Sequence, residues 1–137
     1  MTYVPDTARK QARERSNLRC EYCLLPEGFS FYSHQVDHII ATKHRGSSEV
    51  DNLAWACFEC NNAKGSDIAS IDEETNDLAR LYNPRTQDWD AHFEKVDARI
   101  VGNTPVGRVT VFILQMNHPD QIKIRRNLFA LTAGKWQ

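Results

Sequence analysis

The hydrophobic and polar positions of the first half of the chain predict a basic helix followed by two short strands and a second helix. The expected elements are a polar helix over residues 5–18, strands over 35–40 and 53–56, and a helix that starts near residue 57 and runs through Lys64. Gly46 is the expected turn point of the loop over 41–52 that separates the strands.

The second half mixes helical and strand patterns in the same way. It predicts a helix over residues 72–82 capped by Asp72, a hairpin over 92–101 that turns at Asp97-Ala98, a helix after Thr104-Pro105, and a basic helix from Pro119. Short strands among helices indicate an α+β fold. The longest apolar runs, such as 109–114, are too short to span a bilayer, so no membrane association is expected.

Length and charge limit the possibilities further. The chain has 137 residues, typical of a single domain over 1–137, and 41% of them are hydrophobic. The net charge is −1, but residues 67–98 carry three basic and nine acidic side chains, and residues 99–137 carry six and one. A local basic face could therefore meet phosphates, although solvated helix faces explain the same pattern.

The cysteines carry the strongest local signal. The N-terminus lacks an apolar signal segment, so we expect a cytoplasmic protein in which disulfides are disfavoured. All four cysteines fall into two C-x-x-C pairs, Cys20/Cys23 and Cys57/Cys60, which we call the first and second knuckles. Two such knuckles complete a tetrahedral Cys₄ zinc site with no open position, so this zinc is expected to be structural. A single redox pair would need only one C-x-x-C.

The 33 residues between the knuckles carry candidate chemistry. Asp37 and His38 end the first expected strand, Asn52 precedes the second, and Asn61 follows the last cysteine. If zinc clamps the knuckles together, Asp37 and Asn61 could share one cation. Both offer oxygen ligands, which Mg²⁺ prefers.

These residues also resemble a known family. The runs CEYC, VDHII and DNLAWACFECNNAKG, in this order and spacing, resemble the HNH endonucleases whose ββα-metal finger is braced by a Cys₄ zinc. The resemblance covers residues 19–66, which would form the core. The segments LYNPRTQDWDAHF and RIVGNTPVGRVTV look like the C-terminal extension of small bacterial HNH proteins, over residues 67–137. The resemblance implies a ββα-metal core braced by two zinc knuckles, with flanking helices.

The resemblance also implies roles for single residues. His38 would be the general base, Asp37 and Asn61 the ligands of a catalytic Mg²⁺ or Mn²⁺, and Asn52 the residue that orients the loop and holds the histidine. Lys64 would touch a phosphate. The implied activity is metal-dependent hydrolysis of DNA phosphodiester bonds, with double-stranded DNA as the expected partner.

Other assignments stay open. Lys43, His44 and Arg45 could contact the DNA backbone or form a solvated loop. The rival function is a non-catalytic zinc-ribbon module that binds nucleic acid or protein, and it would have no need for the set Asp37, His38 and Asn61. The oligomeric state is equally open, and a homodimer or a protein partner is possible, because one HNH site cuts one strand at a time.

Overall fold

Three two-stranded antiparallel sheets and a set of short helices make up the structure, a computed structural model that describes residues 3–132. In chain order the elements are α1 (Asp6–Arg15), β1 (Gln35–His38), the 3₁₀ helices η1 (Thr42–His44) and η2 (Val50–Asn52), β2 (Leu53–Ala56), α2 (Phe58–Lys64), β3 (Ala69–Ile71), β4 (Leu78–Arg80), α3 (Trp89–His92), β5 (Phe93–Val96), β6 (Arg99–Gly102), α4 (Pro105–Ile113) and α5 (Pro119–Leu131). The predicted α+β class is confirmed.

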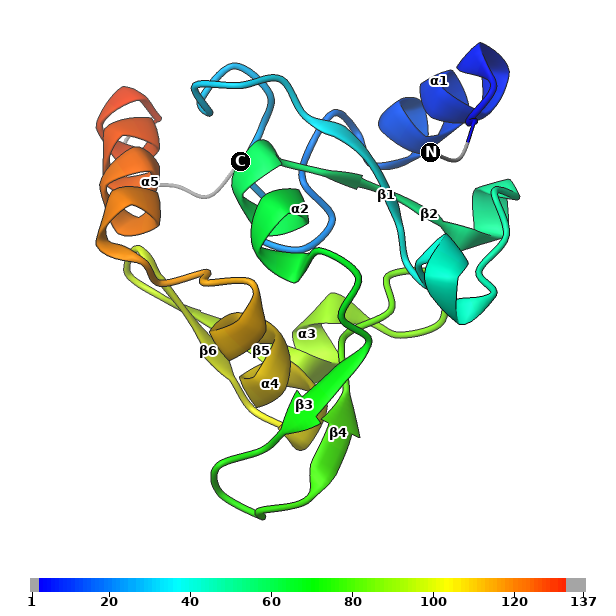
Figure 1. Ribbon diagram of the computed structural model, residues 1–137. Coiled ribbons are helices and arrows are strands. Elements are labelled where there is room, and N and C mark those ends of the chain that lie inside the picture. The colour runs from blue at the N-terminus through cyan, green and yellow to red at the C-terminus, as the bar shows by residue number, and fades with distance from the viewer. Residues whose placement is uncertain (1–2, 133–137) are drawn as a thin grey trace.

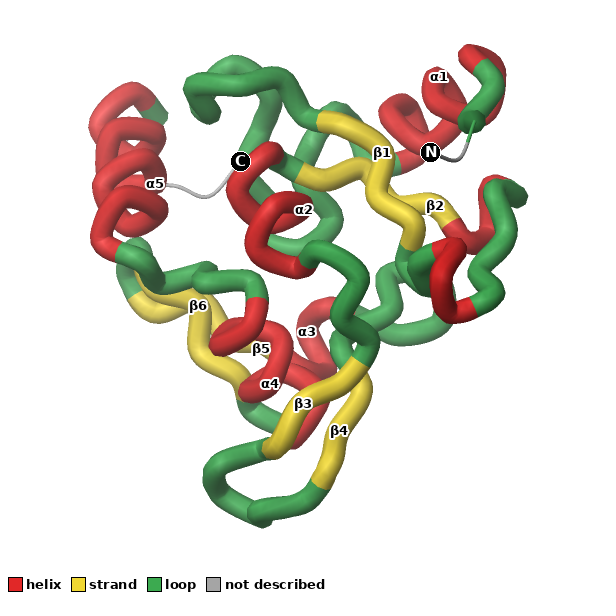
Figure 2. The backbone as a smooth tube through the Cα atoms, in the orientation of Figure 1, coloured by secondary structure: helices red, strands yellow, loops and turns green. Residues whose placement is uncertain are grey.

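The centre of the molecule is a strand–strand–helix unit formed by β1, β2 and α2 (Figures 1 and 2). β1 and β2 pair in antiparallel register, with Asp37 opposite Ala54 and His38 opposite Leu53. β2 is buried along its whole length and leads into α2, whose N-cap is Cys57. The unit agrees with the ββα-metal core that the family resemblance implies.

Helix α1 packs beside β2, and two of its arginines bond to other parts of the molecule. Ala12 is fully buried in a small cluster with Val4 and Leu53. Arg15 donates to the backbone oxygen of Leu53 at 2.7 Å, and Arg13 makes a two-pronged contact with Glu27 at 2.9 Å. These two arginines tie α1 to the segment that follows the first knuckle and to β2.

The prediction of a helix over 72–82 is wrong, because this segment forms the turn and the second strand of the β3–β4 hairpin at the bottom of Figure 1. Asp72 does act as a cap, since its carboxylate accepts from the backbone N–H of Thr75 at 3.1 Å. The turn does not continue into a helix, however. The backbone has φ +59° at Asn76, and Leu78 of β4 then pairs with Ile71 of β3. Arg108 of α4 also forms an ion pair with the Asp72 carboxylate at 2.8 Å. The local sequence pattern cannot reveal a contact between residues so far apart in the chain.

The C-terminal elements largely follow the prediction. β5 and β6 form the expected hairpin, and Thr104 caps α4 by accepting from the N–H of Gly107 at 3.0 Å. Gly107 lets α4 lie close to the chain before β5, because a Cβ there would sit 2.0 Å from the carbonyl oxygen of His92. Helix α5 starts at Pro119 as predicted, but Arg125 is 1% exposed and donates to backbone carbonyls, so it offers no phosphate contact.

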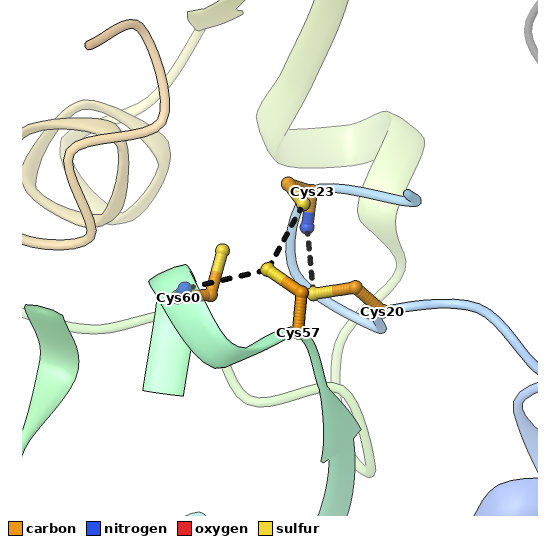
Figure 3. A group of neighbouring side chains, drawn as sticks. All are labelled: Cys20, Cys23, Cys57 and Cys60. Carbon is orange, nitrogen blue, oxygen red and sulfur yellow. Dashed lines mark hydrogen bonds between the residues drawn. The ribbon is translucent and has the colours of Figure 1, made fainter. Parts of the chain in front are cut away.

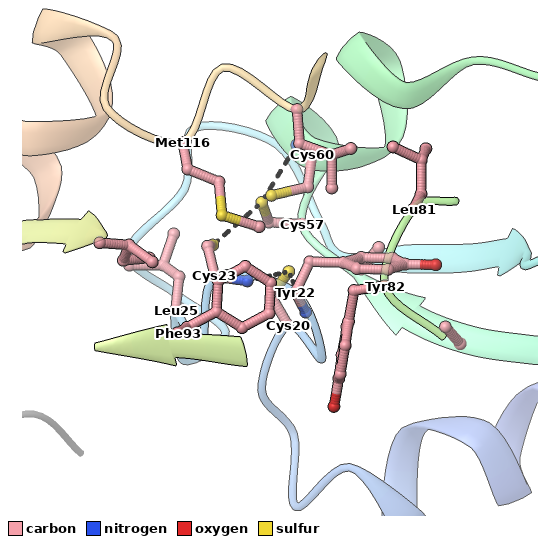
Figure 4. Close-up of a cluster of buried hydrophobic side chains, with 14 of the residues drawn as sticks. Cys20, Tyr22, Cys23, Leu25, Cys57, Cys60, Leu81, Tyr82, Phe93 and Met116 are labelled. Carbon is pink, nitrogen blue, oxygen red and sulfur yellow. Dashed lines mark hydrogen bonds between the residues drawn. The ribbon is translucent and has the colours of Figure 1, made fainter. Parts of the chain in front are cut away.

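One cluster of buried side chains joins the knuckles to the C-terminal elements. Figure 4 shows Tyr22, Tyr82, Phe93 and Met116 around the four cysteines. The Tyr82 ring meets the rings of Tyr22 and Phe93 edge-on, with centroids 6.5 Å and 5.2 Å apart. The cysteines therefore lie in an apolar surrounding that shields them from water. Within residues 3–132, no helix is long and apolar enough to cross a membrane.

Candidate active site and metal centre

The four cysteines converge on one buried point. Their sulfur atoms lie within 4.8 Å of one another, all four residues are buried, and none forms a disulfide in the described chain. Figure 3 shows the first knuckle facing the second, which spans the end of β2 and the start of α2. In a zinc tetrahedron with Zn–S bonds of about 2.3 Å, sulfurs stand about 3.8 Å apart. The Sγ atoms of Cys23 and Cys57 are 3.7 Å apart, so the residues fit the predicted zinc.

Backbone amides support thiolate ligands at both knuckles. The N–H groups of Tyr22 and Cys23 point to Cys20 Sγ at 3.4 Å, and the N–H of Cys60 points to Cys57 Sγ at 3.3 Å. Burial raises the pKa of the Cys20 thiol, but hydrogen bonds from the neighbouring cysteines outweigh burial and hold that pKa well below its ordinary value. Hydrogen bonds with Cys20 and Cys23 hold the pKa values of Cys57 and Cys60 well above their ordinary values, so a metal ion must displace protons from the second knuckle when it binds.

The Asp37 carboxylate lies inside the protein, where it contacts one residue of the first knuckle and one of α2. It is 4% exposed and accepts a hydrogen bond of 2.6 Å from the Tyr22 hydroxyl. The Lys64 ammonium lies 3.1 Å from the same oxygen and 3.2 Å from the other. Burial raises the pKa of Asp37, and the charge of Lys64 opposes that rise. Burial and the adjacent Asp37 charge raise the pKa of Tyr22 well above its ordinary value, so Tyr22 stays a donor.

Lys64 has a different environment from the one expected of a phosphate contact. It is 1% exposed and also donates to the carbonyl oxygen of His38 at 3.0 Å. Cys60 lies one helical turn earlier on α2, which places both side chains on the buried face. The ammonium therefore serves as the internal counter-ion of Asp37. Its position marks the place beside Asp37 where the local field favours a cation.

His38 ends β1 with one ring nitrogen held and the other without a partner. Its Nε2 lies 3.0 Å from the hydroxyl of Ser48, while Nδ1 has no hydrogen-bond partner among residues 3–132. Asn52 does not touch the ring. It accepts from the N–H of Ile40 at 3.0 Å and donates to the carbonyls of Ile40 and Ser47 at 3.0 Å and 2.6 Å. Asn52 thus pins the loop that carries Ser48, and Ser48 in turn orients His38.

Gly46 makes the close return of this loop possible. A Cβ at Gly46 would lie 1.7 Å from the carbonyl oxygen of Ile40 and 2.9 Å from the Asn52 amide nitrogen. Arg45, just before it, adopts φ +72° at the end of η1. The predicted turn point is therefore a position where only glycine fits.

The remaining predicted residues lie on the surface around this centre. Asn61 is half-buried on α2, one turn before Lys64, and its side-chain amide has no partner within the described chain. Lys43, His44 and Arg45 are exposed on and after η1, in the loop that follows β1. Asn61 therefore lies on the same helix as Lys64, and the other three side chains lie on the loop that follows β1.

Two residues of this centre escaped the sequence reasoning. Tyr22 lies between two zinc ligands and was read only as part of a knuckle, although a polar ring in that position must find a partner when buried. Ser48 lies in a run of small polar loop residues without any distinguishing feature. Nothing in the local sequence reveals that it reaches a histidine ten residues earlier.

The comparisons with known proteins bear on the segment that builds this centre. Residues 20–67 match the HNH endonuclease family. This segment is an HNH domain. A stretch of 62 residues is 37% identical to the CRISPR-associated endonuclease Cas9 of Corynebacterium diphtheriae, and the match covers 44% of this chain but only 6% of that protein. No solved structure matches the chain significantly. The HNH domain spans both knuckles, β1, β2 and α2, and thus every residue of the centre described above.

Proposed function

We propose that the protein is a metal-dependent DNA endonuclease, with His38 as general base and with a divalent cation held by Asp37 and Asn61. The observation that carries the proposal is the arrangement of His38 in an HNH domain. One ring nitrogen is tethered by Ser48, the other is free, and a buried carboxylate that already attracts a cation precedes it in the chain. An imidazole nitrogen with a free lone pair suits the removal of a proton from water.

Ser48 supports this role through the choice of tautomer. If its hydroxyl accepts from Nε2–H, the neutral ring keeps its lone pair at Nδ1, which can then take the proton of the attacking water. Asn52 keeps Ser48 in place by its bonds to Ile40 and Ser47. Asn52 thus orients His38 indirectly, through Ser48. Efficient proton transfer requires a base with a fixed orientation.

The residues beside His38 suit an oxygen-preferring cation such as Mg²⁺ or Mn²⁺. Asp37 offers carboxylate oxygens and Asn61 a free amide oxygen, whereas no thiolate is left over for a softer metal. When bound, such a cation neutralises charge that builds on the phosphate and on the leaving 3′ oxygen. The expected product ends are 5′-phosphate and 3′-hydroxyl.

Zinc has a separate part in the proposal. Cys20, Cys23, Cys57 and Cys60 would hold it with four protein ligands, so no position is left for water or substrate. Its contribution is to fix β2 and α2 against the first knuckle, which keeps Asp37, His38 and Asn61 in one arrangement.

DNA is the proposed substrate. The exposed side chains of Lys43, His44 and Arg45 support phosphate contact close to His38, because all lie in the loop that follows β1. The net charge of −1 gives little general attraction to DNA, so binding is expected to be weak at physiological salt. Cleavage of both strands would then need a homodimer or a protein partner, since each chain has one such centre.

A plasmid-relaxation assay in Mg²⁺ or Mn²⁺ tests the proposal, with wild type, His38→Ala and His118→Ala. His118 caps α5 outside the HNH domain and serves as the matched control. We expect cation-dependent nicking by wild type and His118→Ala, loss of nicking in His38→Ala, and one zinc per chain in all three. A wild type that holds zinc and leaves DNA intact would instead support a non-catalytic zinc module.

A further inference from the structure

Tyr22 physically links the zinc knuckles to the proposed cation ligand. Its backbone lies between Cys20 and Cys23, and its hydroxyl donates to Asp37 at 2.6 Å. The residue is fully buried. No other described side chain joins the first knuckle to the Asp37 carboxylate.

The Tyr22 side chain has little freedom to move away. The carbonyl of Tyr22 accepts from the indole N–H of Trp89 at 2.8 Å. The preceding residue, Glu21, makes two hydrogen bonds to Trp55 of β2. Its N–H donates to the carbonyl of Trp55, and its carboxylate accepts from the N–H of Trp55, each at 2.8 Å. The ring itself packs edge-on against Tyr82. The position of the hydroxyl is therefore set by the knuckle and its neighbours.

The second knuckle reaches Asp37 as well. Cys60 and Lys64 share the buried face of α2, and Lys64 contacts both carboxylate oxygens of Asp37. The Asp37 carboxylate thus accepts hydrogen bonds from Tyr22, in the first knuckle, and from Lys64, on the helix α2 that carries Cys60 of the second knuckle. A divalent cation that binds Asp37 would have to displace the Lys64 ammonium, whereas the neutral Tyr22 hydroxyl could stay.

We propose that Tyr22 is a positioning residue that orients the Asp37 carboxylate for the divalent cation and so couples zinc occupancy at the knuckles to cation affinity at Asp37. This inference rests on the proposed function, because it takes Asp37 as a cation ligand. Hydrogen-bond partners of metal-binding carboxylates fix ligand geometry, and their loss weakens metal affinity by roughly 10- to 100-fold. If zinc at the knuckles strengthens cation binding at Asp37, the cation must strengthen zinc binding by the same factor.

The test compares Mn²⁺ affinity in wild type, Tyr22→Phe and Tyr82→Phe, measured by electron paramagnetic resonance of free Mn²⁺ on protein with one zinc per chain. Tyr82→Phe is the matched control, because Tyr82 is buried and its hydroxyl donates to the carbonyl of Gln87, at 3.3 Å, and not to Asp37. We expect Tyr22→Phe to bind Mn²⁺ roughly 10- to 100-fold more weakly at unchanged zinc content, and Tyr82→Phe to match wild type. Equal or tighter Mn²⁺ binding by Tyr22→Phe overturns the role of Tyr22.

A second measurement needs no variant and covers the case in which Tyr22→Phe fails to fold. The zinc affinity of wild type is measured by equilibrium competition with a zinc-selective chelator, with and without saturating Mn²⁺. Coupling predicts tighter zinc binding with Mn²⁺, and an unchanged zinc affinity overturns the coupling. A wild type that does not bind Mn²⁺ at all contradicts the proposed function itself, whereas normal wild-type binding with an unaffected Tyr22→Phe contradicts this inference alone.

Discussion

The buried pair of Lys64 and Asp37 makes a sharp prediction for stability. Lys64→Met keeps the length of the side chain and removes its charge. Both partners are almost fully buried, with 1% and 4% of their side chains exposed, and the ammonium also bonds the carbonyl of His38. Removing one partner of such a pair leaves an uncompensated charge and costs about 3–5 kcal/mol. That is a large part of the roughly 5–15 kcal/mol that stabilises a typical domain.

Urea unfolding at one zinc per chain and constant free zinc measures this loss, because zinc binding itself contributes to apparent stability. We expect Lys64→Met to lose about 3–5 kcal/mol of unfolding free energy. The double variant Asp37→Asn/Lys64→Met should lose less than the two single losses added together, by about 1–3 kcal/mol. A loss below about 1 kcal/mol in Lys64→Met, or strictly additive losses, would refute the described pair.

The same variant has a defined response to pH. Burial already raises the pKa of Asp37, and without Lys64 nothing comparable opposes that rise. The folded variant therefore takes up a proton on Asp37 more readily than the unfolded chain does. Its deficit relative to wild type should shrink as the pH is lowered from about 8 toward about 5. A deficit that stays constant or grows would contradict the assignment of the uncompensated charge to Asp37.

Three further outcomes follow from the loop and from α1. Ser48→Ala should lower the nicking rate about 10- to 100-fold at unchanged zinc content, and equal nicking would remove Ser48 from the proposed orientation of His38. Gly46→Ala should destabilise the fold by about 1–3 kcal/mol in thermal unfolding, since its Cβ would overlap the Ile40 carbonyl, and an unchanged midpoint would contradict the loop geometry. Hydrogen bonds from Arg13, and then from Trp55, hold the pKa of Glu27 below its ordinary 4.5. The charged Glu27 carboxylate therefore stabilises the fold fully at neutral pH, and this stabilisation is lost as the pH falls through the lowered pKa. Glu27→Gln should lower the free energy of unfolding by about 1 kcal/mol at pH near 7 and by little in acid.

The elements that could be predicted from the sequence are those with a local cause. Paired cysteines two residues apart form tight turns on their own, and Thr104-Pro105 carries both a cap and a first-turn proline. The two strands of the central unit follow from short apolar runs, and the last helix from Pro119. Such signals need no distant partner, which is why the corresponding elements are confirmed.

The failures have long-range causes. The β3–β4 hairpin was taken for a helix because Asp72 caps a turn in either structure. The hairpin differs from a helix in the reversal of the chain at Asn76 and in the ion pair of Asp72 with Arg108, 36 residues away. Lys64 was assigned to the surface because lysine is rarely buried without a partner, and its partner, Asp37, lies 27 residues earlier. Contacts of this range exist only once the chain has folded.

We propose that zinc at the four cysteines stabilises the fold and that a second cation, at Asp37, takes part in the reaction. The most direct measurement is the plasmid nicking rate as a function of Mg²⁺ concentration, with total zinc determined on the same samples. We expect a rate that rises from zero and saturates with Mg²⁺ while zinc stays at about one per chain. A rate that follows zinc content and does not respond to Mg²⁺ would contradict this proposal.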